Sequence, residues 1–514
     1  MKAGDYSLKD VMLGVSTWLI LSLFLAKALG YVFNILFIKL FTQEQYGSFV
    51  YAWSWGLFLC GMMMPNIPAA VIRYVAYYRG KSDQALVKST IRTALALTAI
   101  LLPPAIALSY VFYLLGFIKA DMTVIAFIFS VFAINFVACL FSAVISGYRR
   151  PDVSSILNLV QQALRIFAVA LAAFLAVSTN GIFFLVGFGF LLYMLVVALY
   201  EWKNYGLGSK FNWRIAKDLV SYGVYMIFFT TAGNLVSWFG IFFIRYFLSA
   251  EAVAVYHVAL LASGVNLVFF LAVLQIFSPV VSELFGAGRK DRIIYLTSYI
   301  LETFFLMFLP MFLLLIIFAK ELLIIFSKAD YVSGAVPMQI LSIGAFFAGI
   351  SFLFIELIAA EGKPQANARN IGLGALLNVV LNVALIPTYG MVGAAVSNLM
   401  SWILILGLSY LQVKSVVRPS FSARRILRIV LAAGIVGASV VAVKAQACSS
   451  MACLVLSCLL LPLVYLGILI ASRSLRTEDV SLAEATLQKF MVPAGIRSSV
   501  VGFLRCGIHR SKTW

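Results

Sequence analysis

Two basic side chains lie inside long apolar runs of this sequence, where a charge is costly. Lys27 stands near the middle of the run 12–38, and Arg165 stands near the middle of the run 154–177. An ionisable group at bilayer depth usually faces the interior of a helix bundle or a wet cavity. Lysine and arginine in a cleft of low dielectric are suited to binding phosphate. The two residues therefore predict a cationic cavity, with a structural salt bridge or hydrogen bond as the alternative.

Four further residues are candidates for lining that cavity. Arg73 follows two prolines at the end of the second apolar run, where snorkelling to the membrane interface is the alternative explanation. Arg245 lies toward the end of the seventh run. Asn34 and Asn234 are polar residues within apolar runs, and hydrogen bonding between helices is their alternative role.

Three more side chains are candidates for ion coupling. His257 lies toward the end of the eighth run, where an imidazole is suited to taking up a proton; a plain hydrogen bond is the alternative. Glu302 and Glu356 lie inside the ninth and tenth runs, where a carboxylate can hold a cation or pair with an arginine. We therefore expect H+ or Na+ as the coupling ion and no cofactor.

The sequence lacks the residue patterns of catalysis. Its two histidines, His257 and His509, are far apart, and no P-loop, HExxH or nucleophile-elbow pattern occurs. Its six cysteines form no CxxC, and most lie in or beside apolar runs, as small packing residues do. We therefore predict no catalytic site, no metal site and no enzyme activity.

The composition places these residues in a membrane protein. Of the 514 residues, 63% are hydrophobic and 11% are charged, which is too little polar surface for a soluble globule of this size. The net charge of +19 requires no nucleic acid, because a membrane protein with many loops gathers basic residues on its cytoplasmic face. No nucleic-acid-binding motif accompanies the charge, so we expect no nucleic-acid partner.

The apolar runs and the basic residues together predict a topology. Of the 38 Lys and Arg residues, about 30 lie in the connections on the side of the two termini and six lie on the other side. Both termini are therefore predicted in the cytoplasm of a multi-pass protein of the cell membrane. The predicted spans are 12–38, 46–70, 91–116, 122–147, 154–177, 181–202, 218–247, 251–277, 293–318, 334–360, 367–386, 391–413, 426–443 and 451–471.

The first twelve spans repeat with a period of about 208 residues. The segment 44–52 corresponds to 251–259, and each opens the second span of a six-span block. Asn180–Gly181 corresponds to Tyr389–Gly390, and both pairs are predicted in the outer turn between the fifth and sixth spans of a block. Because six is even, the two blocks share one orientation, as in transporters that hold the substrate between parallel repeats.

The predicted fold is an all-α polytopic membrane protein of about 14 transmembrane helices. We predict an N-lobe at 1–210, a C-lobe at 211–415, an additional helix pair at 416–471 and a basic cytoplasmic tail at 472–514. The tail fits two descriptions equally well, a short amphipathic helix at the membrane surface or a solvated, partly disordered segment. Such a helix would bury Val480, Leu482, Leu487, Phe490 and Met491.

One local motif carries a family resemblance. Asn378 and Asn382 share a helix face, Pro387 ends that helix, Gly390 makes a turn, and Gly393 opens the next helix among small residues. This motif resembles the signature of the polysaccharide transporter family, the Wzx-type lipid-linked oligosaccharide flippases. The family belongs to the superfamily of multidrug, oligosaccharidyl-lipid and polysaccharide exporters. Packing is the better explanation for most residues of the motif.

The resemblance implies a function. It implies a flippase that moves a polyprenyl-(di)phosphate-linked oligosaccharide across the cytoplasmic membrane by alternating access, for the synthesis of polysaccharide or surface glycan. The implied partners are that substrate, membrane lipids and the glycan polymerase or glycosyltransferase machinery. A cation-coupled multidrug extruder, a lipid II flippase and a non-transporting scaffold remain as alternatives. The basic character of Lys27 and Arg165 favours an anionic cargo.

Overall fold

The computed structural model describes residues 17–62, 66–119, 121–148, 150–205, 210–417, 422–445, 450–472, 474–481, 484, 495, 497–498 and 501–502. Their regular secondary structure is helical apart from one isolated bridge residue, Leu475, which confirms the predicted all-α class. The helices form two compact units. One comprises Thr17–Val258 and Ile371–Ser401, and the other includes Ala259–Asn370 and Trp402 onward. The predicted lobe boundaries stay a prediction.

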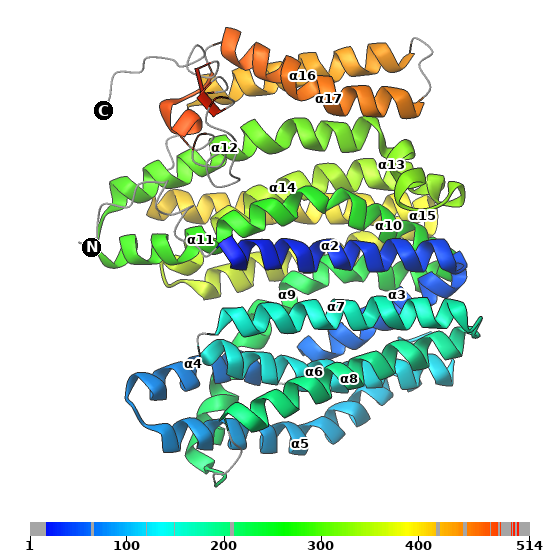
Figure 1. Cartoon of the computed structure of the whole chain (residues 1–514), viewed down its shortest axis with the longest axis vertical. Helices are drawn as coiled ribbons and strands as arrows, with labels where there is room; N and C mark the ends of the chain where they lie inside the picture. The colour runs from blue at the N-terminus through cyan, green and yellow to red at the C-terminus, as the bar shows by residue number, and fades with distance from the viewer. Residues whose placement is uncertain are drawn as a thin grey trace. The chain divides into compact units, whose positions relative to one another are not determined.

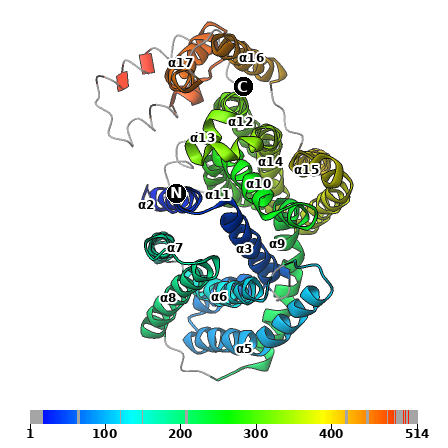
Figure 2. The same ribbon diagram turned by 90° about the vertical axis from the view of Figure 1, so that its right-hand side faces the viewer.

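The first unit is built around α6. This helix contacts α3, α4 and α8, while α9 packs against α3, α4 and α5. The helix α2 lies alongside α7, as Figures 1 and 2 both show. The bounds are α2 Thr17–Leu40, α3 Gln43–Met62, α4 Ile67–Gly80, α5 Gln84–Leu114, α6 Met122–Gly147, α7 Pro151–Phe174, α8 Thr179–Tyr205, α9 Trp213–Phe247 and α10 Ala250–Ser263.

The second unit is built around α12, which contacts α11, α14 and α16. The additional pair, α16 and α17, packs together, and its core joins Ile429, Val436 and Tyr465 to Phe318. The bounds are α11 Val265–Gly286, α12 Lys290–Ile317, α13 Ala319–Phe326, η1 Ala329–Gly334, α14 Ala335–Ala360, α15 Pro364–Val416, α16 Ala423–Ala445 and α17 Ser450–Ala471.

The tail contributes one of its five predicted apolar residues to this core. Val480 is buried, at 4% exposure, in the cluster that α16 and α17 form with Phe318. The other four, Leu482, Leu487, Phe490 and Met491, lie outside the described residues. The residues around Val480, 477–481, are helical, and both descriptions of the tail stay predictions.

The helices follow the predicted spans closely. The helix α6 has the predicted bounds, 122–147. Two predicted spans are each a pair of helices: 46–70 becomes α3 and α4, and 251–277 becomes α10 and α11, which meet at Gly264. Among the described residues, eight helices are long and apolar enough to cross a membrane, or up to ten if each bent pair is one span. The count of 14 stays a prediction.

The signature motif forms the kink within α15. The backbone leaves the helical conformation at Gly390, whose φ is 57° and ψ is −136°, a region that glycine adopts without steric cost. A Cβ on Gly393 would lie 2.5 Å from the carbonyl oxygen of Leu385. The amide of Asn382 donates to Oδ1 of Asn378 at 2.8 Å, and both are buried. These contacts support packing as the role of the motif.

The corresponding turn in the first unit differs from the prediction. The helix α7 ends at Phe174 and α8 begins at Thr179, so Asn180 and Gly181 lie in the first turn of α8 rather than between the helices. The residue with a left-handed backbone is Ala176, with φ 48°. The sequence favoured the Asn-Gly pair because such pairs mark turns, but here the turn precedes it.

Candidate substrate and ion sites

Arg165 on α7 is a cation surrounded by aromatic rings. Its guanidinium carbon lies 4.1 Å from the ring centre of Phe33, 4.9 Å from that of Trp53 and 5.7 Å from that of Phe190. Nη1 donates to Oε1 of Gln162 at 3.3 Å, and the buried Nε has no hydrogen-bond partner within the part of the chain that the structure describes. No carboxylate of the described chain forms an ion pair with it. Cation–π contacts therefore hold the charge and leave donors unused.

One face of the neighbouring helix, α2, carries two polar side chains and a glycine that lies against α7. Lys27, Gly30 and Asn34 are three and four residues apart, a spacing that places them on one helix face. A Cβ on Gly30 would lie 3.9 Å from Oε1 of Gln162, so this face meets the side chain that contacts Arg165. Lys27 is exposed, and within the described residues no carboxylate pairs with it. We call Lys27, Asn34, Gln162 and Arg165 the basic cluster.

Asn34 continues into a chain of hydrogen bonds. The hydroxyl of Tyr46 donates to Oδ1 of Asn34 at 2.8 Å and lies 2.9 Å from Nδ1 of His257. A phenol carries a single proton, so once that proton goes to Asn34 the bond to His257 must be donated by its Nδ1–H. These hydrogen bonds therefore join Asn34, a candidate for lining the cavity, to His257, a candidate for ion coupling. Sequence reasoning did not single out Tyr46 or Gln162.

Close packing of two helix backbones positions the hydrogen-bonded residues Asn34, Tyr46 and His257. Gly47 follows Tyr46 on α3, and a Cβ there would overlap the carbonyl oxygen of Ala250 at the start of α10. The absence of a side chain at Gly47 lets α3 and α10 approach closely. That approach brings His257 on α10 within reach of Tyr46.

The remaining cavity candidates have other neighbours. The guanidinium of the exposed Arg73 lies 4.6 Å from the ring centre of Tyr222 and 5.7 Å from that of Tyr74. Arg245 is half-buried near the end of α9. Asn234 lies in α9, but its side chain is outside the described residues. No contact described for Arg73 or Arg245 joins them to the basic cluster.

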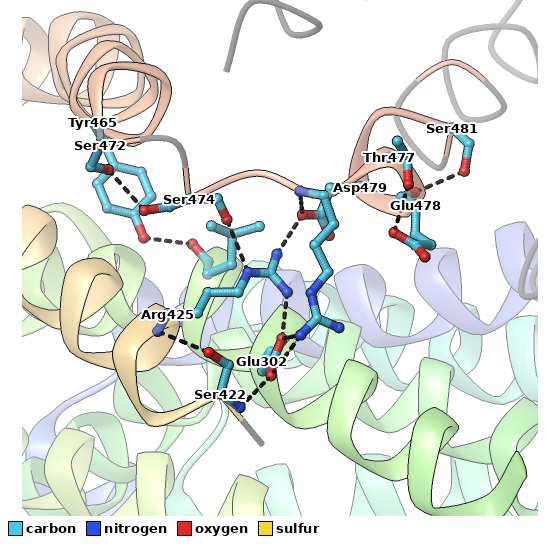
Figure 3. Close-up of polar contacts among 12 residues, drawn as sticks. Glu302, Ser422, Arg425, Tyr465, Ser472, Ser474, Thr477, Glu478, Asp479 and Ser481 are labelled. Atoms are coloured by element: carbon cyan, nitrogen blue, oxygen red, sulfur yellow. Dashed lines mark hydrogen bonds and ion pairs between the residues drawn. The ribbon is translucent and has the colours of Figure 1, made fainter. Parts of the chain in front are cut away.

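Glu302 has the most extensive polar contacts of the ion-coupling candidates. Its carboxylate is fully buried and accepts from Arg425 Nη1 at 2.5 Å (Figure 3). It also accepts from Arg476 Nη2 at 2.8 Å. The backbone N–H of Ser422 donates to Oε1 at 2.9 Å. The contacting residues lie on α12, at the start of α16 and in the segment after α17. They favour the arginine-pairing alternative for Glu302 over a cation site.

A second carboxylate completes this C-terminal ion-pair network, which comprises Glu302, Arg425, Arg476 and Asp479. Arg425 Nη2 donates to Asp479, and its Nε donates to the carbonyl oxygen of Ser474 at 2.9 Å (Figure 3). Asp479 also accepts the backbone N–H of Arg476 at 2.7 Å. Burial raises the pKa of Asp479, and the charge of Arg425 opposes that rise. The negative charges of two carboxylates thus balance the positive charges of two guanidinium groups.

Glu356 differs from Glu302. It is half-buried on α14, and no ion pair is described for it. Among the described residues, no three His, Cys, Asp or Glu side chains lie close enough together to hold a metal ion.

Comparisons with known proteins match this fold. A family model described as polysaccharide biosynthesis protein matches residues 14–285, and the MatE model matches residues 226–384. Two solved structures superpose on most of the chain. The inward closed lipid II flippase MurJ has a TM-score of 0.68 at 15% identity, over 88% of this chain and 98% of its own. An inward-facing multidrug resistance MATE transporter of the MOP superfamily has a TM-score of 0.63 at 13% identity, over 76% and 95%.

Two curated relatives are archaeal. The uncharacterized membrane protein MJ1068 of Methanocaldococcus jannaschii is 23% identical over 76% of this chain and 81% of its own length. The probable low-salt glycan biosynthesis flippase Agl15 of Haloferax volcanii is 24% identical over 41% of this chain and 46% of its own.

The chain therefore shares its fold with the lipid II flippase MurJ and with a MATE transporter of the MOP superfamily. The chain belongs to the polysaccharide biosynthesis protein family, whose model matches more than half of it. The resemblance inferred from the signature motif is thus confirmed.

Proposed function

We propose that this protein is a flippase for a polyprenyl-(di)phosphate-linked oligosaccharide and acts in the synthesis of polysaccharide or surface glycan. Membership of the polysaccharide biosynthesis family supports this, as does the relative whose name describes a glycan biosynthesis flippase. The observation that carries the proposal is Arg165, a cation with unused donors and no carboxylate partner in the described chain. An anionic ligand is the partner that such a group lacks.

The basic cluster suits a phosphate with an attached sugar. A planar guanidinium can bind phosphate through two N–H groups at once, and Lys27 adds a second positive charge on the facing helix. The aromatic rings of Trp53 and Phe190 beside Arg165 give apolar surface, while Asn34 and Gln162 offer amides for hydroxyl groups. In this proposal the polyprenyl tail stays in the bilayer while the head group enters the cluster.

The movement that we propose is alternating access between the two lobes, in the cytoplasmic membrane and with both termini in the cytoplasm. The positive-inside distribution of basic residues supports the orientation. The protein would act as a transporter rather than an enzyme, with membrane lipids as partners and the glycan polymerase or glycosyltransferase machinery as a further partner. A gradient of H+ or Na+ would drive the cycle, and no cofactor would be needed.

A multidrug extruder and a lipid II flippase share this fold and are the alternatives. A pump for cationic drugs needs an acidic or neutral binding site, whereas Arg165 and Lys27 are basic, which favours an anionic cargo. Lipid II is itself an anionic lipid-linked sugar, so the basic cluster fits that cargo too.

Complementation tests the proposal. A strain lacking its oligosaccharide flippase would express the native chain, Lys27→Ala, Arg165→Ala or the control Lys203→Ala, which removes an exposed positive charge from α8. We expect surface glycan from the native chain and the control, and precursor accumulation in the two cluster variants. Equal glycan in all four would remove the basic cluster from the proposal. Drug resistance without glycan from any of several cargoes would favour the extruder.

A further inference from the structure

Glu201, near the end of α8, is a buried acid that the proposed function has not used. It is 2% exposed, and neither carboxylate oxygen has a hydrogen-bond partner among the described residues. None of the ion pairs in the described chain includes it. Buried polar groups are almost always hydrogen-bonded, so such an exception calls for an explanation.

The helix face that carries Glu201 is otherwise apolar. Tyr193 and Val197 lie eight and four residues before it, on the same face of α8, and both are buried against α6 and α7. Ile145 of α6 and Leu157 of α7 belong to this same core. The carboxyl group therefore lies at one end of an apolar core, and apolar side chains do not stabilise a negative charge.

The charged and titratable groups around Glu201 come from each neighbouring element. Tyr148, at the end of α6, interacts electrostatically with Glu201, and the guanidinium of Arg79 lies 4.8 Å from its ring centre. From the start of α7, Arg150 and Asp152 pair with each other at 3.0 Å and are exposed. On α8 itself, Lys203 is exposed. None of these basic groups is described in contact with the carboxylate.

Arg79 is held away from Glu201 by its own contacts. It lies one turn after Val75 on α4, and a Cβ on Gly147 would be 2.8 Å from the Cβ of Val75, so α4 and α6 are packed tightly here. Nη1 of Arg79 donates to the carbonyl oxygen of Gly147 at 3.4 Å. In this conformation Arg79 therefore contacts α6 and not the acid on α8.

We propose that Glu201 is a proton-binding site and is protonated in this conformation. The carboxylate takes one proton from the water beyond the end of α8 and returns it there when the carboxyl group becomes exposed or Arg79 moves toward it. A buried carboxylic acid with no cationic partner is stable as the neutral form, whereas the carboxylate is not. Glu201 thus makes the transport cycle sensitive to pH on the side of the membrane where α8 ends, a step that rests on the proposed flippase function.

Infrared difference spectroscopy tests proton binding without any cargo. Full-length protein in lipid nanodiscs would be compared with Glu201→Gln and with Glu283→Gln, an exposed carboxylate on α11 that serves as the control. We expect a protonated-carboxyl C=O band at neutral pH that Glu201→Gln loses and Glu283→Gln keeps. A band of unchanged intensity in Glu201→Gln would show that Glu201 is ionised and would overturn the proposal. If Glu201→Gln fails to fold, Glu201→Asp should shift the band, and an unshifted band would overturn it equally.

A second measurement separates this proposal from the flippase itself. Glu201→Gln should lose glycan export while retaining folded protein in the membrane, because its side chain can no longer release a proton. Glycan rescue by the native chain with no band assigned to Glu201 would keep the flippase and reject the proton site. The band without rescue would keep the proton site and reject the flippase.

Discussion

Arg425 donates to Glu302 at 2.5 Å across 123 residues of sequence and ties the start of α16 to α12. Glu302 is 0% exposed and Arg425 is 6% exposed, so water screens neither charge. Arg476 adds a second bond to the same carboxylate. The additional helix pair is therefore attached to α12 by charge as well as by apolar packing.

Removing Arg425 should destabilise the fold strongly. Arg425→Ala leaves Glu302 buried with one of its two arginines missing, and breaking a buried pair in this way typically costs about 3–5 kcal/mol. We expect a large drop in the thermal unfolding midpoint of detergent-purified protein. The neighbour Arg424 is exposed, so Arg424→Ala is the matched control and should change stability little. Equal midpoints for the two variants would show that the network adds nothing.

The signature glycine Gly393 should be intolerant of any side chain. Gly393→Ala places a methyl group 2.5 Å from the carbonyl oxygen of Leu385, and such overpacking costs roughly 1–3 kcal/mol. Gly407 lies in the same helix with no atom within 4 Å of its Cβ position. Gly407→Ala should be neutral or stabilising by up to about 1 kcal/mol. Unfolding midpoints that fall equally in both variants would contradict a packing role specific to the signature.

The hydrogen-bond chain through Tyr46 predicts the tautomer of His257. Because the phenol proton goes to Asn34, the neutral imidazole should carry its proton on Nδ1. The sequence has only two histidines, so nitrogen NMR of selectively labelled protein can report His257, with His509→Ala for assignment. Tyr46→Phe removes the hydroxyl and should shift the Nδ1 signal. If the proton is found on Nε2 and Tyr46→Phe does not change the spectrum, the hydrogen bond from His257 to Tyr46 would be refuted.

The sequence predicted what depends on local pattern. Apolar runs fixed the bounds of helices such as α6, and the glycines of the signature predicted the kink at Gly390, because both signals lie within a few residues of the structure that they describe. Lys27 and Arg165 could be singled out because a charge inside an apolar run is visible in sequence alone. The companion of Arg165, Gln162, is three residues away and could have been found by helical spacing.

Contacts across long sequence separations could not be predicted. Arg476 contacts Glu302 across 174 residues of sequence, and no periodicity links the two residues. Both roles of Glu302, binding a coupling ion and pairing with an arginine, therefore remained as alternatives. Glu201 lies at the end of an apolar run, where acids are commonly solvated, and only its burial without a partner distinguishes it.

Binding of a polyprenyl diphosphate to the purified protein in nanodiscs tests the central claim most directly. Charged hydrogen bonds are worth about 1.5–3 kcal/mol, so Arg165→Ala should weaken binding roughly 10- to 150-fold. Arg165→Lys should fall between, because lysine keeps the charge but not the planar fork. The control Lys203→Ala should bind as the native chain does. Equal affinity of Arg165→Ala and Lys203→Ala would contradict the assignment of Arg165 as the phosphate-binding residue.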